Sequence, residues 1–350
     1  MKYEINGYNV FFIILVTFFI SAFLIPLIMR LAKHIGAMDI PKDNRRMHTK
    51  PMPKMGGLAI FLAFLAGYIF FAPVSAQMNS ILIASIILVI LGIADDIKPL
   101  GALPQFIVQI IAASVVVFYG GIYLPQVSAF GLHLNFGIWG YPLAVIFIVS
   151  VMNIMNFIDG IDGLSSGIAS IYFTTIAVIA FILNRHGGLD VILCLLMLGS
   201  TLGFLIHNFE PAKIYIGEAG IMFLGLMIAV IALLGFKAAT VTTLFVPILI
   251  LFLPIMDTFL AIIRRILKGE KIWSPDKQHM HHQLYNLNKS VRKTVLTMYG
   301  ISILCAAISV FYALGNNQLA ILLYIILMLV LLFLIWKTDI LFQKQEKSQK

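Results

Sequence analysis

The feature that most constrains this chain is a series of apolar blocks, most close to 20 residues long, that runs almost from end to end. A helix needs about 20 apolar residues to cross the roughly 30 Å hydrocarbon core of a bilayer, whereas strands of a transmembrane barrel alternate over about 10 residues. With 61% hydrophobic and only 11% charged residues, the chain is neither an ordinary water-soluble domain nor disordered. The sequence therefore predicts an all-α polytopic membrane protein.

Eleven such segments can be drawn, which predicts a bundle of about 11 transmembrane helices. The first lacks a small-residue cleavage site and is followed directly by Arg30 and Lys33, so we interpret it as a retained helix rather than a signal peptide. Without a repeat or a second, soluble domain, we expect residues 1–350 to form a single integral membrane domain. The predicted segments are 8–29, 56–74, 79–94, 104–119, 140–157, 166–184, 189–206, 219–236, 241–263, 294–314 and 318–336.

The basic residues predict the orientation of this bundle. Of the 24 Lys and Arg residues, 21 fall on one side of the predicted segments and three on the other. Cytoplasmic loops carry such an excess, so we expect the N-terminus outside and the C-terminus in the cytoplasm. This placement explains the net charge of +9 without a nucleic-acid partner, and we expect none. The cytoplasmic loops in which we expect the active site are about 30–55, 95–103, 158–165, 207–218 and 264–293.

Carboxylates gather at the cytoplasmic ends of the predicted helices, and membrane anchoring does not explain them. Asp95 and Asp96 end the third segment. Adjacent residues on a helix face different directions, so one carboxylate can face a site while the other serves a different partner. A solvated helix end is the alternative.

A second polar group, NIMNFIDGIDGL at residues 153–164, leaves the fifth segment. Asp159 and Asp162 are spaced i, i+3, with Asn153 and Asn156 one turn further back on the same side. Such hard oxygen ligands suit Mg²⁺, which takes one or two carboxylates and completes its shell with substrate phosphates. A polar loop stabilised by Asx turns is the alternative. Because carboxylates at a membrane edge are costly, we favour a functional site.

Glu218 stands between Gly217 and Gly220, just before the eighth segment. An acid at a helix start can cap exposed N–H groups, and it can equally be a further metal ligand. Its position in the sequence does not separate these two roles.

The loop after the first segment carries Arg45, His48 and Lys54, which could bind phosphate at the bilayer surface. The general excess of basic residues in cytoplasmic loops is the competing explanation.

The loop 264–293 combines Arg264 with His279, His281 and His282. Basic and imidazole groups are suited to holding phosphates and orienting a nucleotide. A zinc site and a basic patch on anionic lipid are the alternatives. Asp257, within the preceding segment, is expected to face the bundle and to pair with Arg264.

Together and in this order, these segments resemble the polyprenyl-phosphate N-acetylhexosamine-1-phosphate transferase family (glycosyltransferase family 4) over about residues 39–283. The motifs that carry the resemblance are DIPKDNRRMHTKPMPKMGG, the ADD at 94–96, NIMNFIDGIDGL, IGEAG at 216–220, and PIMDTFLAIIRRILKG running into DKQHMHH. The resemblance implies ten or eleven transmembrane helices with a cytosolic active site, in a bacterial plasma membrane.

The resemblance also implies a reaction. Members transfer a sugar 1-phosphate from a UDP-sugar to undecaprenyl phosphate with Mg²⁺, or Mn²⁺ as an alternative, and release UMP. The product is the first lipid-linked intermediate of a cell-envelope glycan such as teichoic acid or O-antigen. The HMHHQL pattern looks more like the branch that uses UDP-GlcNAc. The partners implied are therefore a UDP-sugar, undecaprenyl phosphate and the lipid bilayer, with a homodimer as a further candidate.

By motif position, the resemblance assigns roles to individual residues. Those expected in catalysis are Asp95, Asp96, Asp159 and Asp162, and those expected to hold the metal are Glu218, Asp95 and Asp159. Those expected to bind substrate are Asn153, Asn156, Arg45, His48, Lys54, Arg264, His279, His281 and His282.

One motif departs from the family. The family pattern is Gly-Asp-x-Gly followed by Ser, and here it is Gly217-Glu218-Ala219-Gly220-Ile221. Mg²⁺ demands near-ideal geometry, so the longer side chain affects rate and metal preference. A catalytically impaired relative is therefore one alternative. A transporter of an anionic or lipid-linked sugar is another, although a transporter should place ionisable groups near the bilayer midplane.

Overall fold

The computed structural model describes residues 4–40, 51–129, 132–183, 187–238, 252–267, 269 and 280–337. Its helices are α1 (Val10–Ile35), α2 (Gly56–Phe71), α3 (Ala76–Ile97), α4 (Ala102–Ser114), α5 (Gly140–Ile158), α6 (Leu164–Ile182), α7 (Leu189–Asn208), α8 (Gly217–Ala238), α10 (Phe252–Leu267), α11 (Met280–Asn288), α12 (Val291–Ala313) and α13 (Asn317–Lys337). The π-helix η1 (Val115–Tyr119) continues α4, and the 3-10 turn η2 (Gly137–Trp139) precedes α5. Three two-stranded antiparallel hairpins pair β1 (Glu4–Ile5) with β2 (Tyr8–Asn9), β3 (Met38–Asp39) with β4 (Met52–Pro53), and β5 (Gln126–Ala129) with β6 (Leu132–Asn135).

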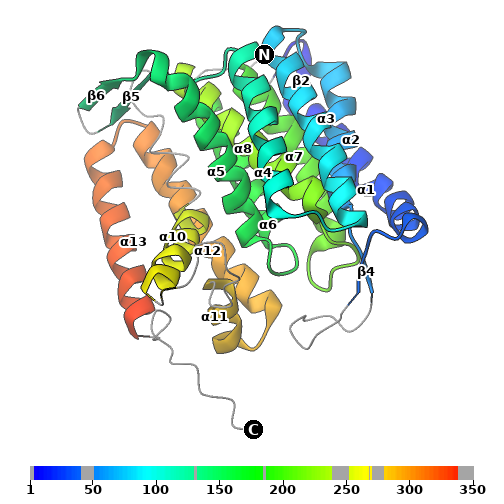
Figure 1. The fold of residues 1–350 in the computed structure, drawn as a ribbon. Helices are drawn as coiled ribbons and strands as arrows, with labels where there is room; N and C mark the ends of the chain where they lie inside the picture. Colours follow the sequence, from blue (N-terminus) through cyan, green and yellow to red (C-terminus); the bar gives the residue numbers. More distant parts are fainter. Residues whose placement is uncertain are drawn as a thin grey trace.

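The helices form one bundle (Figure 1). The described strands occur only in short hairpins at the ends of this bundle. Within the described residues, eight helices are long and apolar enough to cross a bilayer, and Gly56–Phe71 and Gln318–Phe333 are shorter apolar helices. The prediction of an all-α polytopic membrane fold is thereby confirmed. The number of eleven crossings stays a prediction.

Helix α8 occupies the centre of the bundle, where almost all its side chains are buried. It packs against α2, α3, α5, α6 and α7. Small residues permit this packing, because a Cβ on Gly57 of α2 would lie 1.9 Å from the Gly220 Cα, and a Cβ on Gly92 of α3 would lie 2.2 Å from the Ala219 Cα. Helices in a bilayer associate through such close backbone approach, since lipid tails supply little hydrophobic driving force between helices. The first turn of α8, which carries Glu218, is thus placed against α2 and α3.

Outer helices present apolar side chains to their surroundings. On α1, Phe11, Phe19 and Phe23 are exposed, and on α13 Leu322 and Leu329 are exposed. Large apolar faces left open in this way are typical of a surface covered by lipid.

The two ends of the bundle differ. The β1–β2 hairpin and the β5–β6 hairpin lie at one end, whereas α11 and the last turn of α13 lie at the other (Figure 1). The β3–β4 hairpin also lies at this second end. It follows Gly36, which ends α1 in the left-handed conformation at φ 81°. Because Met38 pairs with Pro53, the hairpin brings residue 54 back to the end of α1.

Candidate active site

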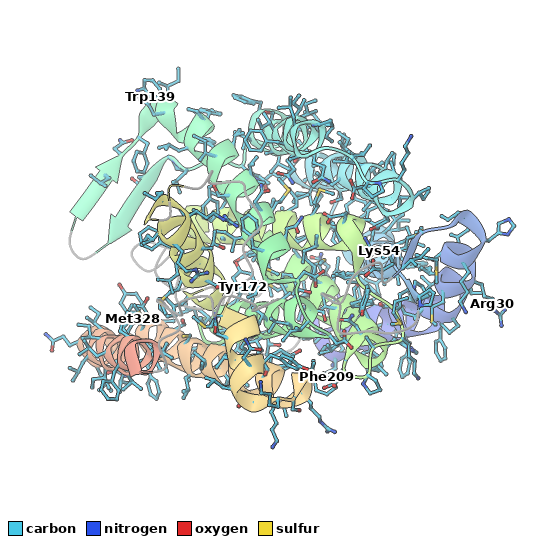
Figure 2. The ribbon with its side chains drawn as sticks, turned by 60° about the horizontal axis from the view of Figure 1, so that its bottom comes forward. Arg30, Lys54, Trp139, Tyr172, Phe209 and Met328 are labelled. Carbon is cyan, nitrogen blue, oxygen red and sulfur yellow. The ribbon has the colours of Figure 1, made fainter. Side chains whose placement is uncertain are left out.

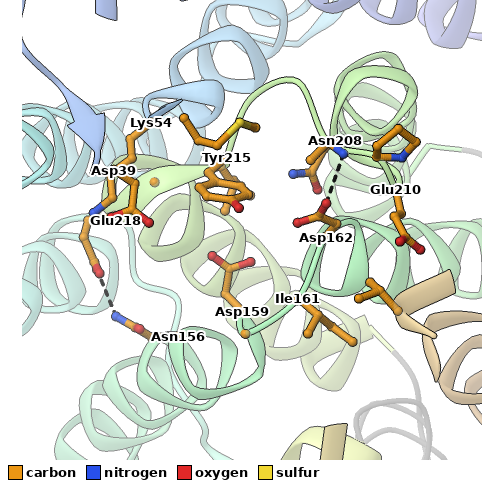
Figure 3. Close-up of a pocket in the computed structure, with 17 residues that line it drawn as sticks. Asp39, Lys54, Asn156, Asp159, Ile161, Asp162, Asn208, Glu210, Tyr215 and Glu218 are labelled. Carbon is orange, nitrogen blue, oxygen red and sulfur yellow. Dashed lines mark hydrogen bonds between the residues drawn. The ribbon is translucent and has the colours of Figure 1, made fainter. Parts of the chain in front are cut away.

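A cleft of about 510 Å³ opens at the end of the bundle that carries α11 (Figures 2 and 3). Its walls come from four places: the β3–β4 hairpin and the residue that follows it, the α5–α6 loop, the α7–α8 loop with the first turn of α8, and the start of α12. These segments belong to four of the five loops in which the sequence predicts the active site. Figure 3 shows Asp159 pointing toward Tyr215, with Glu218 and Lys54 on one side and Asp162 on the other.

Asp96 faces the start of α8. Its Oδ1 accepts a hydrogen bond of 3.0 Å from the backbone N–H of Glu218, so it caps the first turn of α8 from another helix. Its Oδ2 is buried and has no hydrogen-bond partner within the described part of the chain. Gly217 (φ 72°) is required here, because a Cβ at this position would lie 2.4 Å from the Asp96 Oδ2. An unpartnered, buried carboxylate oxygen is costly unless something binds it.

Asp95 faces another way, as expected for a neighbouring residue on a helix. Its Oδ1 accepts hydrogen bonds of 2.6 Å from the Leu100 N–H and 2.7 Å from the Gln105 Nε2. It therefore fixes the turn between α3 and α4. Neither Asp95 nor Asp96 is among the described residues that line the cleft. Both nevertheless interact electrostatically with the carboxylate of Glu218, which does line it.

The acids of the α5–α6 loop are held by neighbouring segments. Helix α5 ends at Ile158, so Asp159 and Asp162 lie beyond the helix rather than on one of its faces. The Asp159 Oδ1 accepts a hydrogen bond of 2.6 Å from the Ser165 hydroxyl. The Asp162 Oδ2 accepts a hydrogen bond of 3.0 Å from the Ala212 N–H. Both carboxylates line the cleft.

The two asparagines of the same motif have different partners. The Asn156 Nδ2 donates to the Glu218 Oε2 at 2.9 Å, and both residues line the cleft. The Asn153 Nδ2 donates to the Gln109 Oε1 at 2.8 Å, a contact between α5 and α4. The structure therefore places Asn156 in the cleft and Asn153 in the helix packing behind it.

The predicted basic residues are only partly described. Lys54 lines the cleft and interacts electrostatically with Asp96, Asp159 and Glu218. Arg264 is buried on α10 and is not among the described residues that line the cleft. Arg45, His48 and His279 lie outside the described residues. The backbone of His281 and His282 belongs to the first turn of α11, and their side chains also lie outside the described part.

The environment of Asp159 makes its carboxyl group harder to ionise than it is in water. Although the residue as a whole is exposed, desolvation by the protein atoms around its carboxylate raises its pKa from 3.8 to about 6. The Ser165 hydroxyl and the Lys54 charge act in the opposite direction, and Asp162 adds to the rise. The cleft thus concentrates more negative charge than its one described lysine balances.

Several residues that hold or line the cleft were not predicted as site residues. Asp39 and Tyr215 line it. Asn208 is buried, where its Oδ1 accepts from the Gly163 N–H at 3.1 Å and its Nδ2 donates to the Ile214 carbonyl at 3.0 Å. The signal for Asn208 was its place in the polar run HNFEP at the end of an apolar segment. Tyr215 gives no local signal, and Asp39 opens the motif DIPKDNRRMHTKPMPKMGG but is not singled out by it; only the pairing of distant loops brings the two residues to one cleft.

The donor set suits a hard divalent cation. Among the described residues, no group of three or more His, Cys, Asp or Glu side chains could hold a metal ion, so they form no all-protein cage. Mg²⁺ rarely uses such a cage, since it binds through one or two carboxylates and substrate phosphates. Asp159 and Glu218, which both line the cleft, fit that requirement.

The fold and the cleft together define a polytopic helical membrane protein with a carboxylate-rich cleft at one end of its bundle. Within that class, the chain belongs to glycosyl transferase family 4, whose sequence model matches residues 78–236. This confirms the resemblance found in its motifs.

Three relatives illustrate the match. A Bacillus subtilis (strain 168) protein, named "Probable undecaprenyl-phosphate N-acetylglucosaminyl 1-phosphate transferase", is 37% identical over 278 residues, which cover 78% of this chain and 76% of the relative. The "Decaprenyl-phosphate N-acetylglucosaminephosphotransferase" of Mycobacterium tuberculosis (strain ATCC 25618 / H37Rv) is 36% identical, with coverage of 81% and 78%. The "Undecaprenyl-phosphate alpha-N-acetylglucosaminyl 1-phosphate transferase" of Haemophilus influenzae (strain ATCC 51907 / DSM 11121 / KW20 / Rd) is 30% identical, with coverage of 83% and 84%.

Proposed function

We propose that this protein transfers N-acetylglucosamine 1-phosphate from UDP-GlcNAc to undecaprenyl phosphate, releasing UMP and forming the first lipid-linked intermediate of a cell-envelope glycan. The transferred group follows the names of all three relatives, and undecaprenyl phosphate as acceptor follows those of the Bacillus subtilis and Haemophilus influenzae proteins. The observation that carries the proposal is the convergence of Asp159, Glu218 and Lys54 in one cleft, with Asp96 directly behind it.

The reaction joins two anions. An oxygen of the lipid phosphate attacks the sugar-bearing phosphorus of the nucleotide sugar. A new P–O bond forms, the bond from that phosphorus to the bridging oxygen breaks, and UMP leaves with the bridging oxygen. The second pKa of a phosphate monoester is about 6, so the attacking oxygen is largely deprotonated at neutral pH. A general base is therefore less important than orientation and charge balance.

The described residues have distinct parts in this reaction. Asp159 and Glu218, which both line the cleft, would hold Mg²⁺, or Mn²⁺ in its place, together with substrate phosphates. When bound, the ion supplies positive charge that offsets repulsion between the phosphates and stabilises the leaving UMP. Asn156 holds the Glu218 carboxylate in place. Lys54 is placed to meet a phosphate at the cleft wall.

The setting we propose is the bacterial plasma membrane, with the cleft in the cytoplasm. The excess of Lys and Arg in the loops around the cleft supports this orientation. The soluble UDP-sugar would enter from the cytoplasm, and the lipid phosphate from the inner leaflet.

The test is UMP release by the purified protein with UDP-GlcNAc, undecaprenyl phosphate and Mg²⁺. We expect release that requires all three components and falls at least about 100-fold in Asp159→Asn. Glu4→Gln, at the opposite end of the molecule, is the matched control and should retain full turnover. A folded wild-type protein that releases no UMP would instead indicate a catalytically impaired relative or a transporter.

A further inference from the structure

Lys54 is the only basic residue among the described residues that line the cleft. Its ammonium group interacts electrostatically with Asp96, Asp159 and Glu218, which come from three different elements. Asp39, Asp162 and Glu210 also line the cleft, beside Asp159 and Glu218. Figure 3 shows Lys54 on the same side of the cleft as Glu218. One positive charge therefore faces a cluster of acids that it cannot neutralise alone.

The backbone at this position is fixed by two neighbouring segments. The Lys54 N–H donates to the Ala37 carbonyl at 3.0 Å, at the end of α1. On either side of Lys54, the Tyr215 N–H donates to the Pro53 carbonyl at 2.8 Å, and the Gly56 N–H donates to the Tyr215 carbonyl at 2.9 Å. The lysine is thus anchored between the β3–β4 hairpin and the loop before α8. Its four-carbon side chain still lets the ammonium group move between partners.

We infer that Lys54 is the internal counter-ion of the metal-free cleft and competes with the divalent cation for the same carboxylates. A lysine ammonium is a compact, mobile point charge, and like charges repel strongly where solvent screening is reduced. A cation that enters therefore displaces the ammonium from the acids, which frees it to contact a phosphate. Lys54 would in this way weaken metal binding to the empty cleft while favouring metal and phosphate together. The inference rests on the proposed function in one respect, because it takes a divalent cation as the ion of this cleft.

The experiment measures binding of Mn²⁺ alone to the purified, full-length protein in detergent, from the free Mn²⁺ signal in electron paramagnetic resonance. We expect Lys54→Gln to bind Mn²⁺ at least about tenfold more tightly than the wild type, because a nearby positive charge has been removed. Lys54→Arg keeps the charge and should stay within about threefold of the wild type. Glu4→Gln is the control for a distant charge change. Inorganic phosphate should strengthen Mn²⁺ binding in the wild type and less so in Lys54→Gln.

Unchanged or weaker Mn²⁺ binding in folded Lys54→Gln overturns the inference, as does equally tight binding in Lys54→Gln and Lys54→Arg. If Lys54→Gln does not purify as a monodisperse protein, Lys54→Met, which keeps the apolar stem, takes its place in the same titration. UMP release separates this inference from the proposed function. If the wild type releases UMP but loss of Lys54 does not increase Mn²⁺ affinity, only the inference is wrong. If loss of Lys54 increases Mn²⁺ affinity but the wild type releases no UMP, only the transferase assignment is wrong.

Discussion

At the scale of single residues, Glu218 carries the departure of this chain from its family's motif. Its side chain is one methylene longer than that of aspartate. The Asn156 Nδ2 donates a hydrogen bond of 2.9 Å to its carboxylate oxygen Oε2. Asp96 fixes the backbone of the same residue. The extra length is therefore accommodated by a hydrogen bond at its end, which orients the carboxylate toward the cleft.

We expect Glu218→Asp to alter the metal dependence of the reaction. A shorter side chain leaves Asn156 without its partner and retracts the carboxylate from the cleft. For a residue that helps to hold the cation, such a change should shift the Mg²⁺ concentration for half-maximal turnover by about tenfold or more. Glu218→Gln keeps the length but removes the charge and should weaken Mn²⁺ binding further. An unchanged rate and metal affinity in Glu218→Asp would count against a role as ligand.

The raised pKa of Asp159 leads to a prediction on stability. A carboxyl group with a higher pKa in the folded than in the unfolded protein binds its proton more tightly when folded, so stability falls as the pH rises from 3.8 to about 6 and stays lower above it. In metal-free protein, Asp159→Asn should therefore raise the unfolding temperature at pH 7.5 and change it little at pH 4.5. The effect should be small, since water screens an exposed residue.

Thermal unfolding in detergent with EDTA, at both pH values, measures this. The Ser165 hydroxyl can still donate to an asparagine carbonyl, so the substitution preserves the local contact. Glu4→Gln should show no such pH dependence. A lower unfolding temperature for Asp159→Asn at pH 7.5 would contradict the prediction.

The neighbouring acids show how far the sequence predicts a site at this scale. It predicts that Asp95 and Asp96 face different directions, which the structure bears out, but not which of them faces α8. That choice depends on the rotation of α3 about its axis, which is set where Gly92 meets Ala219. Asn153 and Asn156 are likewise equivalent in the sequence, and only the packing of α4 and α8 against α5 gives them different partners.

At the scale of elements, apolar length predicts the helices well and their ends less well. Segment 56–74 is expected to run three residues beyond α2, which ends at Phe71. The i, i+3 spacing of Asp159 and Asp162 suggests a helical face, yet α5 ends at Ile158. At the end of α2 the Asn6 Nδ2 donates to the Phe71 carbonyl, and after α5 the Ser165 hydroxyl donates to the Asp159 carboxylate. A periodic pattern carries no information on such partners outside the helix.

Helix α12 supports the loop that carries these aspartates. The Tyr299 hydroxyl donates to the Gly163 carbonyl, directly after Asp162. The Arg292 guanidinium lies 5.9 Å from the centre of the Phe209 ring, on the neighbouring α7–α8 loop. The α5–α6 loop and the α7–α8 loop of the cleft are thus both in contact with α12.

We expect Tyr299→Phe to destabilise the protein by about 0.5–1.5 kcal/mol, the usual net worth of one hydrogen bond. Turnover should fall as well, because the Gly163 carbonyl loses a support and the aspartate loop can shift from its productive position. Thermal unfolding and UMP release measure the two effects. Tyr8→Phe removes a hydroxyl at the opposite end of the molecule and should change neither. Full turnover in Tyr299→Phe would show that α12 does not position this loop.

At the scale of the whole molecule, the sequence predicts that the two ends of the bundle differ in charge. The β1–β2 hairpin lies at the end away from the cleft, and the last turn of α13 lies at the cleft end (Figure 1). Of the 24 basic residues, 21 fall in loops and a tail assigned to the cleft side. A surface of this charge would attract phosphorylated substrates, and the positive-inside bias predicts that it faces the cytoplasm.

These charges predict that residue 4 is outside the cell and residue 289 inside it. Both positions are exposed and lie at opposite ends of the bundle. The native Cys194 and Cys305 are buried and can be replaced by alanine, so that only the introduced cysteine reacts with the label. In intact cells, a membrane-impermeant maleimide should label Glu4→Cys and should label Lys289→Cys only after the membrane is permeabilised. Each variant is the control for the other. The reverse pattern would place the cleft outside, away from any cytoplasmic UDP-sugar, and labelling of both in intact cells would mean an even number of crossings between them.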